Sequence, residues 1–347
     1  MILWHTPLSE NDIRRCLRSA TGATLGFTLC KFFNCGYGVF FTVVPILLLG
    51  MVPKMNAKMA QQCIAAAVVC AIEVGIFGGL FGSHPALMST IAFFLFLSKF
   101  ACMSKGSLFL FATNCVLNLS IMLHFASYPG TNVNDLIFTN LGASLLSVVI
   151  AFMMVALIPD IQVKIATKPH APPTQAKQIQ RMRHETLLGA SMATLSFLVF
   201  QIFDLQDSMS AQATTILLLF PMHWNGALSY ARKRVMGTIL GVSMGLAVQL
   251  FLYNWSGVLI LIIPLLWIGL MLGSYAHAKE GGGSGIGFAM LTTQGILFGQ
   301  YLAPESDFVF NALYRVSSIL IAVIVTLFVC YLIHRLLNSF PATRFGQ

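Results

Sequence analysis

Long apolar runs recur along this chain, and they restrict it to a fold in which most residues lie in membrane helices. Of its 347 residues, 57% are hydrophobic and 9% are charged, whereas about a quarter of the residues in soluble domains are charged. Twelve runs are long enough, or nearly so, to cross the ~30 Å hydrocarbon core of a bilayer as helices. They cover residues 19–33, 38–52, 59–81, 86–103, 107–125, 137–158, 186–203, 208–224, 235–253, 257–275, 285–302 and 308–333. We therefore expect an all-α integral membrane protein with about twelve transmembrane helices.

The distribution of cations predicts how these helices are oriented. With the N-terminus inside, nearly all of the 20 Lys and Arg residues fall in cytoplasmic segments, among them Lys99 and the run Arg232–Arg234. The outer connections hold no Lys or Arg but carry acidic residues: Asp135, Asp204, Asp207, Glu305 and Asp307. Cytoplasmic segments of membrane proteins are enriched in cations, so both termini are expected in the cytoplasm, with no cleaved signal peptide. The net charge of +9 follows from this topology and does not indicate nucleic-acid binding.

The chain also contains an internal repeat. Displaced by about 170 residues, the segment Ala23–Leu25 falls on Ala193–Leu195, and Ile46–Leu49 falls on Ile216–Leu219. Because an even number of helices precedes the second copy, both copies enter the membrane from the cytoplasm and form a parallel repeat. The predicted domains are a six-helix repeat at residues 1–158, a cytoplasmic linker at 159–185 and a second six-helix repeat at 186–347.

The ninth run opens with cations and continues with small residues at a spacing of four. Gly237, Gly241 and Gly245 form one stripe along a helix, where another helix backbone can approach closely. Together with Arg234 and Thr238 they resemble the signature of the fusaric-acid resistance superfamily, in which a basic loop precedes the glycine motif. The resemblance implies a bacterial inner-membrane exporter of small anionic or aromatic compounds, working with a periplasmic adaptor of the membrane-fusion type. Larger members also carry soluble domains, whose activities cannot be transferred to this chain.

Other functions stay open at this point. Plant malate channels are more distant relatives, so a passive anion channel is an alternative, as is a membrane scaffold that transports nothing. A major-facilitator transporter also has two parallel six-helix halves, but the connection Gly50–Lys58 lacks the Asp-Arg pair that such proteins usually carry there. The bilayer and a small-molecule substrate are the expected partners, and a homo-oligomer is an open alternative.

Motifs of enzymes are absent from the chain: it has no Walker loop, no G-x-S-x-G elbow and no HExxH. The 8 Cys residues form no CxxC pair, so neither a metal site nor a cofactor is expected. Uphill transport would therefore use an ion gradient, with a proton as the default ion. The glycine-rich segment Gly281–Gly287 is expected to be a flexible turn or a gating hinge.

Three ionisable residues lie within predicted membrane helices: Lys31, Glu73 and Arg315. Such residues are rare in hydrocarbon and often line paths for substrates or protons. Glu73 and Arg315 have a similar predicted depth, so they are expected to pair, either as a structural ion pair or as a joint site for a proton and an anion. Lys31 is close to the outer end of its helix, where it either snorkels to the interface or attracts substrate.

Uncharged polar residues mark two further helices. Asn114 and Asn118 share a face of the fifth helix, and Thr293 and Gln294 lie in the eleventh. These residues either form hydrogen bonds between helices or line a substrate path. At the outer helix ends, histidines are expected to be solvated or to admit protons: His84 and His124.

Overall fold

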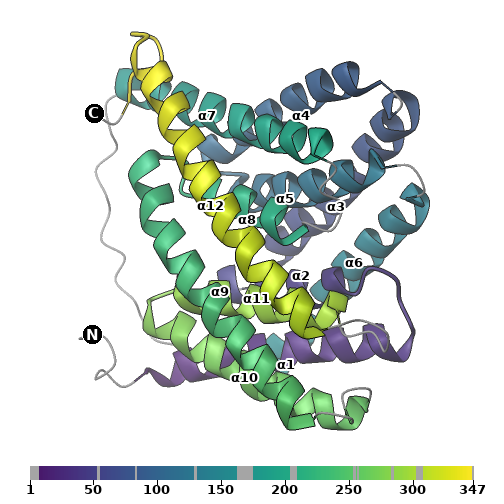
Figure 1. Ribbon diagram of the computed structural model, residues 1–347. Helices are drawn as coiled ribbons and strands as arrows, with labels where there is room; N and C mark the ends of the chain where they lie inside the picture. The colour runs from purple at the N-terminus through teal and green to yellow at the C-terminus, as the bar shows by residue number, and fades with distance from the viewer. Residues whose placement is uncertain are drawn as a thin grey trace. The chain divides into compact units, whose positions relative to one another are not determined.

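The computed structural model describes residues 8–345, apart from 53–54, 83, 129–130, 162–174, 204–208, 253–254, 256–257, 283–284 and 302–307. Within these ranges the regular structure is helical (Figure 1). The helices are α1 Glu10–Phe32, α2 Val39–Met51, α3 Ala57–Phe81, α4 Pro85–Lys105, α5 Phe109–Ala126, α6 Val133–Leu157, α7 Gln175–Ile202, α8 Met209–Leu219, α9 Trp224–Leu252, α10 Leu259–Lys279, α11 Ile286–Tyr301 and α12 Phe308–Asn338. The all-α prediction is thus confirmed for the described part of the chain. The outer acidic residues Asp204, Asp207, Glu305 and Asp307 lie outside it.

Local sequence signals explain where several helices begin and end. Ser9 caps α1, because its hydroxyl accepts a hydrogen bond from the Asp12 amide while the Asp12 carboxylate accepts one from the Ser9 amide. Pro85 occupies the first turn of α4, where its missing N–H leaves no bond unmade, and Gly106 ends that helix at φ 80°. Three helices begin well before their apolar runs: α1 starts at Glu10, α7 at Gln175 and α9 at Trp224.

Eight of the helices are long and apolar enough to cross a membrane, by length and composition: α3, α4, α5, α6, α7, α9, α10 and α12. The sequence predicted about twelve spans; over their described residues, α1, α2, α8 and α11 are not among these eight. The apolar part of α2 has 13 residues, which at 1.5 Å per residue gives about 20 Å and falls short of the hydrocarbon core. The described helices therefore include both full spans and shorter apolar helices.

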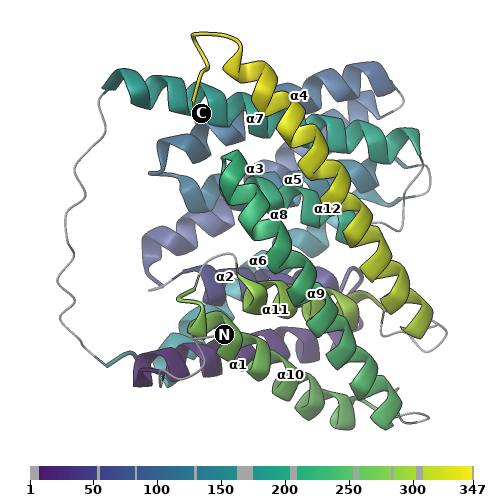
Figure 2. The ribbon, with the colours of Figure 1, turned by 60° about the vertical axis from the view of Figure 1, so that its left-hand side comes forward.

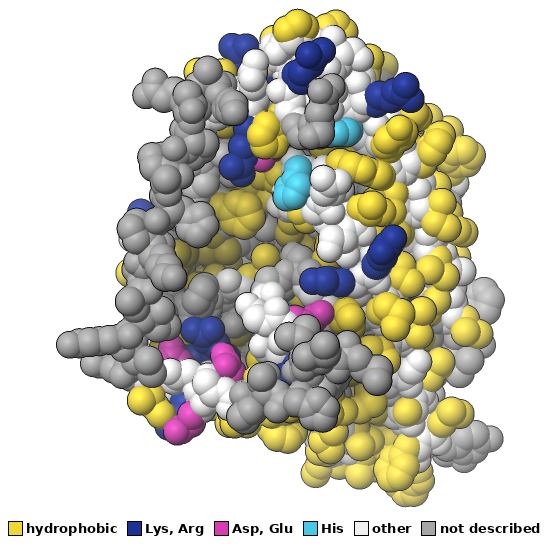
Figure 3. Space-filling view, turned by 90° about the vertical axis from the view of Figure 1, so that its left-hand side faces the viewer, with side chains coloured by type: hydrophobic (Ala, Val, Ile, Leu, Met, Phe, Trp, Pro, Cys, Tyr) yellow, Lys and Arg dark blue, Asp and Glu magenta, His cyan; other side chains and the backbone are white. Residues whose placement is uncertain are grey.

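The outward faces of the long helices are apolar. On α3, the exposed residues Val68, Ile72, Ile76 and Leu80 follow one another at a spacing of four and so form a single stripe. Figure 3 shows hydrophobic side chains over much of one face of the molecule. Exposed apolar surface of this extent belongs against lipid rather than water. The protein is a multi-pass membrane protein.

The helices form two compact units. Unit 1 comprises Met1–Ile64, Asn134–Asp160 and Arg232–Leu320, and unit 2 comprises Ala65–Val133, Ile161–Ala231 and Ile321–Gln347. In unit 1, α1 and α11 each pack against both α2 and α10, and α1 and α10 lie side by side in both ribbon views (Figure 2). The residues of α2 and α11 are buried on nearly all sides, so these two helices form the core of unit 1.

Close backbone contacts hold that core together. A Cβ atom at Gly38 would lie 2.6 Å from the carbonyl oxygen of Gly299, and one at Gly26 would overlap the carbonyl oxygen of Phe41. The indole of Trp267 on α10 donates a hydrogen bond of 3.0 Å to the hydroxyl of Thr21 on α1. Unit 1 therefore depends on small residues where its helices cross.

Unit 2 has a corresponding set of contacts. In it α4 packs against α5 and α7, and α8 packs against the same two helices. The residues of α5 and α8 are buried on nearly all sides. The amide of Gln212 on α8 donates a hydrogen bond of 2.6 Å to the hydroxyl of Ser120 on α5, and the Tyr128 hydroxyl donates one of 2.9 Å to the Phe200 carbonyl.

Candidate functional site

A buried arginine lies at the start of the glycine stripe in unit 1. Arg234 is 0% exposed, and its Nη1 donates a hydrogen bond of 2.6 Å to the Thr292 hydroxyl on α11. The sequence predicted that Arg234 lies in a basic loop before the glycine motif, whereas in the structure it is part of a helix. Because α9 already begins at Trp224, the cations belong to its helical part, where Arg232 and Lys233 are exposed and Arg234 turns inward.

The glycine stripe itself adjoins α11. Gly237, Gly241 and Gly245 are buried, and so is Thr238. A Cβ atom at Gly237 would lie 2.5 Å from the Cβ of Ala289, and one at Gly241 would lie 2.9 Å from the Cβ of Thr293. These distances are below ordinary van der Waals contact, so α9 and α11 approach each other as closely as they do because glycine occupies these positions.

The polar residues predicted on α11 lie inside unit 1. Thr293 and Gln294 are buried, and the Gln294 amide lies beside Gly269 of α10. Among the described residues, neither polar atom of the Gln294 side chain has a hydrogen-bond partner, and the hydroxyls of Thr293 and Thr238 have none either. Buried polar atoms of this kind are rare in folded proteins. Their clustering in apolar helices makes this part of unit 1 a candidate for contact with a polar ligand.

In unit 2 the central polar feature is a buried ion pair. Lys99 of α4 donates a hydrogen bond of 2.5 Å to Oε1 of Glu73 on α3. Lys99 is 7% exposed, so it is buried inside the protein, and its position on the cytoplasmic side stays a prediction. The expected partner of Glu73 was Arg315, whereas the ion pair in the structure is with Lys99. The other carboxylate oxygen of Glu73, Oε2, is buried and has no hydrogen-bond partner among the described residues.

The helix pair α3 and α5 carries further polar contacts in unit 2. The Cys70 thiol donates to the Cys115 carbonyl at 3.5 Å, and the Cys115 thiol to the Ala66 carbonyl at 3.8 Å. Asn114 is buried, but its amide donates to the Leu110 carbonyl of its own helix at 3.0 Å. Asn118 is buried as well. The Cys70 and Cys115 thiols and the Asn114 amide therefore each donate a hydrogen bond to a nearby backbone carbonyl.

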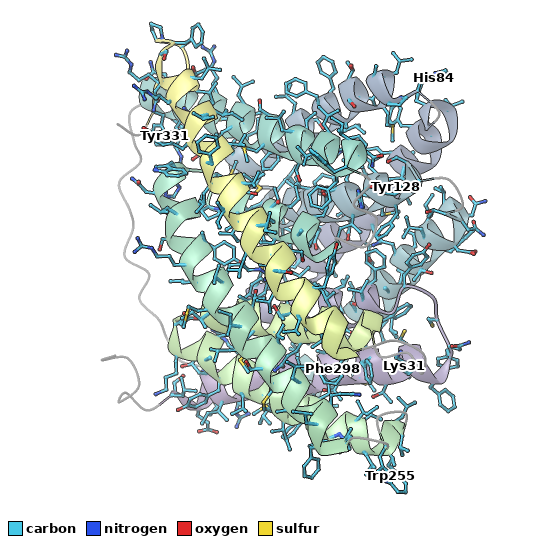
Figure 4. All side chains as sticks on the ribbon, in the orientation of Figure 1. Lys31, His84, Tyr128, Trp255, Phe298 and Tyr331 are labelled. Atoms are coloured by element: carbon cyan, nitrogen blue, oxygen red, sulfur yellow. The ribbon has the colours of Figure 1, made fainter. Side chains whose placement is uncertain are left out.

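The remaining predicted residues are placed as follows. Lys31 is half-buried at the end of α1, with its ammonium 6.0 Å from the ring centroid of Phe27 (Figure 4). Arg315 belongs to unit 1 and is 1% exposed. His84 is exposed, as expected. His124 is fully buried against the rings of Phe125, Tyr128 and Phe200, so the expectation of a solvated His124 is wrong.

Two family models match the chain. Residues 15–154 match a family described as a protein of unknown function, DUF2955. Residues 194–329 match the fusaric acid resistance protein-like family, and this range contains Arg234 and the whole glycine stripe. Over this range the chain is fusaric acid resistance-like. The resemblance inferred from the glycine motif is thereby confirmed. Searches of the curated proteins and of the solved structures found no significant match.

The fusaric acid resistance-like range contains the buried polar residues of α9 and α11 described above, from Arg234 to Gln294. The ion pair of Glu73 with Lys99 lies instead within the range that matches the other family. The sequence analysis missed Lys99 as a partner of Glu73, because it assigned Lys99 to a cytoplasmic segment together with the other cations. A signal was present, since Lys99 lies six positions before Lys105, the last residue of α4, and is thus about 9 Å inside the helix end.

Proposed function

We propose that this protein exports small anionic or aromatic compounds across the inner membrane, driven by protons. The match to the fusaric acid resistance-like family supports membrane transport in general. The observation that carries the finer proposal is the Glu73–Lys99 pair, because it unites a group that can take up a proton with a cation that can hold an anion. Both residues lie in helices apolar enough to span a membrane.

The pair couples the two events by charge. While Glu73 is ionised, its carboxylate holds the ammonium of Lys99, and an anion has to compete with it. When Glu73 takes up a proton, Lys99 keeps its charge in apolar surroundings without a counterion, a state that is costly in a membrane. An anionic substrate then supplies the missing charge. Proton uptake thus favours the anion-bound state, which is the coupling that a gradient-driven transporter needs.

The packing within each unit supports an arrangement of two repeats. Unit 1 combines α1 and α2 with α10 and α11, whereas unit 2 combines α7 and α8 with α4 and α5. In two parallel six-helix repeats, each helix corresponds to the helix six places along the chain. By this correspondence α1 and α2 of unit 1 match α7 and α8 of unit 2, and α10 and α11 match α4 and α5. We propose repeats at residues 1–158 and 186–347, joined by the linker 159–185. In this arrangement both termini are cytoplasmic, and a periplasmic adaptor of the membrane-fusion type is the expected partner.

Transport into proteoliposomes tests the proposal. The purified protein is reconstituted, and uptake of a panel of small carboxylates is followed with and without a pH gradient. Wild type should accumulate at least one of them against its gradient. Glu73→Gln should lose accumulation while downhill exchange continues, and Lys99→Gln should lose both. Glu10→Gln is the matched control, because Glu10 pairs with Arg14 at the exposed start of α1.

Three outcomes would contradict the proposal. Downhill flux alone in the wild type, whatever the pH gradient, would make the protein a channel. Absence of flux for every compound would favour a scaffold. Normal accumulation by a folded Glu73→Gln variant would show that proton coupling does not occur at this pair.

A further inference from the structure

A cavity of about 250 Å³ lies in unit 1, where four segments meet. These are the start of α1, the end of α2, the end of α10 and the turn that follows α10. The predicted topology puts all four at the cytoplasmic side. In the turn, Gly281 and Gly282 line the cavity with φ values of 79° and 80°, which favour glycine. None of the residues predicted as a substrate site from the sequence lines this cavity.

Four polar atoms of residues that line the cavity are buried without a hydrogen-bond partner among the described residues. They are Nε of Arg15, Oγ of Ser19, Oγ of Ser274 and Nδ1 of His277. Buried polar groups in native proteins nearly always have a partner. Four such atoms in the residues around one cavity make its contents the candidate partner for these bonds. Arg15 Nε can only donate, and both serine hydroxyls can donate, so a ligand that bonds to them there carries acceptors.

The charge of Arg15 indicates that the acceptor is an anion. Arg14 pairs with Glu10 at 2.8 Å, and Arg18 pairs with Asp160 at 2.6 Å, but Arg15 has no ion pair among the described residues. Asp12 also lines the cavity, although its carboxylate already accepts hydrogen bonds from the hydroxyl and amide of Ser9 at 2.5 and 3.3 Å. Arg15, which lines the cavity, is therefore the one of the three arginines at the start of α1 that forms no ion pair with a described carboxylate.

His277 adds a site for a proton. Its Nε2 lies 3.1 Å from the Gly50 carbonyl oxygen, which can only accept, so Nε2 carries the hydrogen and Nδ1 of the neutral ring is an acceptor. A proton taken up at Nδ1 turns this atom into a donor towards the cavity. The other titratable groups near His277 are Asp12, Arg15 and Cys16 of α1 and Lys279 and Glu280 after it. The cavity-lining residues of α2 add none.

Part of the lining is apolar. Leu49, Met51 and Val52 at the end of α2 line the same cavity as the polar atoms. An inorganic anion would leave these side chains without a partner, whereas an organic anion can place its apolar part against them. The combination of donors, an arginine without an ion pair and apolar side chains matches a small organic carboxylate.

We propose that this cavity binds a small organic carboxylate, held by Arg15, Ser19 and Ser274, and that His277 takes up a proton together with it. The inference rests on the proposed function in one respect, namely that the bound carboxylate is the transported one. Binding itself does not depend on transport. The anion and the proton each favour the binding of the other, because protonated His277 becomes a second positive charge beside the carboxylate.

Calorimetry on the full-length protein in detergent tests this inference, with benzoate as the probe. In the wild type, the dissociation constant of benzoate should rise as the pH rises from 6 to 8. Titrations in two buffers of different ionisation enthalpy should show uptake of about one proton per benzoate near pH 7.5, above the usual histidine pKa. His277→Gln keeps an N–H donor for the Gly50 carbonyl but cannot titrate, so it should abolish both the pH dependence and the proton uptake.

Variants of the anion-binding residues complete the test. Arg15→Gln should raise the dissociation constant at least tenfold and Ser274→Ala several-fold, whereas Arg14→Gln is the matched control and should change it less than twofold. Ser274→Ala keeps the test decisive where Arg15→Gln fails to fold. If the wild type shows no saturable binding, the cavity holds water and the inference is wrong. It is also wrong if inorganic phosphate binds as tightly as benzoate, or if Arg15→Gln and Arg14→Gln behave alike.

Failure of this inference and failure of the proposed function can be told apart. Benzoate binding with the expected effects, but without transport of any carboxylate in proteoliposomes, would refute the proposed function and leave the site intact. Transport of benzoate that is unchanged in Arg15→Gln and Ser274→Ala would refute the site and leave the function intact.

Discussion

A single methyl group added at Gly237 should weaken unit 1. The Cβ atom of Gly237→Ala would lie 2.5 Å from the Cβ of Ala289 and 3.0 Å from the amide nitrogen of Met290, and it would overlap the carbonyl oxygen of Ile286. Ordinary contacts begin at about 3.4 Å, so α9 and α11 would have to move apart by roughly 1 Å in a close-packed interior. Overpacking of this kind costs about 1–3 kcal/mol, which corresponds to a fall in melting temperature of about 2–10 °C.

Gly142→Ala is the matched control for this prediction. Gly142 lies in α6, is exposed, and has nothing within 4 Å of the position that its Cβ would take. Alanine is the better helix former by about 1 kcal/mol, so this variant should melt at the same or a slightly higher temperature. The two substitutions are chemically identical, and their expected effects differ in sign because the surroundings differ.

The melting temperatures can be measured with a thiol-reactive dye on purified protein in detergent. Six of the cysteines are buried and react when the protein unfolds. Burial raises the pKa of the Cys16 thiol to about 11, so at neutral pH hardly any of it is in the reactive thiolate form before unfolding. Equal melting temperatures for Gly237→Ala and Gly142→Ala would refute the close approach of α9 to α11 and the role that we assign to the glycine stripe.

Three further predictions concern the charges and the topology. Lys99→Met should lower the melting temperature strongly, because removal of one partner of a buried ion pair costs about 3–5 kcal/mol; Glu73→Gln combined with it should restore most of the loss, and additive effects in the two variants would contradict the pair. The bond of 3.0 Å between His184 and His334 needs one neutral ring, since His184 gives its Nδ1 hydrogen to the Thr343 carbonyl and two protonated rings would face each other with N–H donors; acidification well below pH 6.5, which protonates both rings, should therefore loosen the C-terminal segment, seen as faster proteolysis there, and His334→Ala should make it fast at every pH. Tags at residue 170, outside the described residues, and at the C-terminus should both be cytoplasmic, and an external tag at 170 would overturn the positive-inside argument.

Much of the helical architecture could be predicted from apolar runs because lipid leaves the backbone few alternatives. Most helix bounds lie within a few residues of the runs. The three early starts, Glu10 for α1, Gln175 for α7 and Trp224 for α9, were missed for one reason. The helical segments before the apolar runs contain polar and charged residues, and hydropathy cannot tell a polar helix from a polar loop. For the same reason Arg234 was assigned to a loop. In the structure it lies within α9 and donates a hydrogen bond to the Thr292 hydroxyl.

Pairing of charges could not be predicted, because it depends on which helices become neighbours. Glu73 was recognised as an intramembrane acid, but depth alone suggested Arg315 as its partner. In unit 2 the structure brings Glu73 of α3 next to Lys99 of α4, and the two side chains form an ion pair. Similarly, Ser19 and Ser274 line one cavity although they are distant in sequence, and nothing in either local sequence distinguishes them from serines that face a neighbouring helix.

Each unit contains helices from both halves of the chain, that is, from both proposed repeats. The core of unit 1 consists of α2 from the first predicted repeat and α11 from the second, and that of unit 2 of α5 from the first and α8 from the second. Each unit therefore buries one apolar helix from each half of the chain. The polar clusters are not copies of each other, since Glu73 corresponds to Ser243 under the displacement of about 170 residues. If the two units arose from one ancestral pattern, their helix packing has been retained while their charges have diverged.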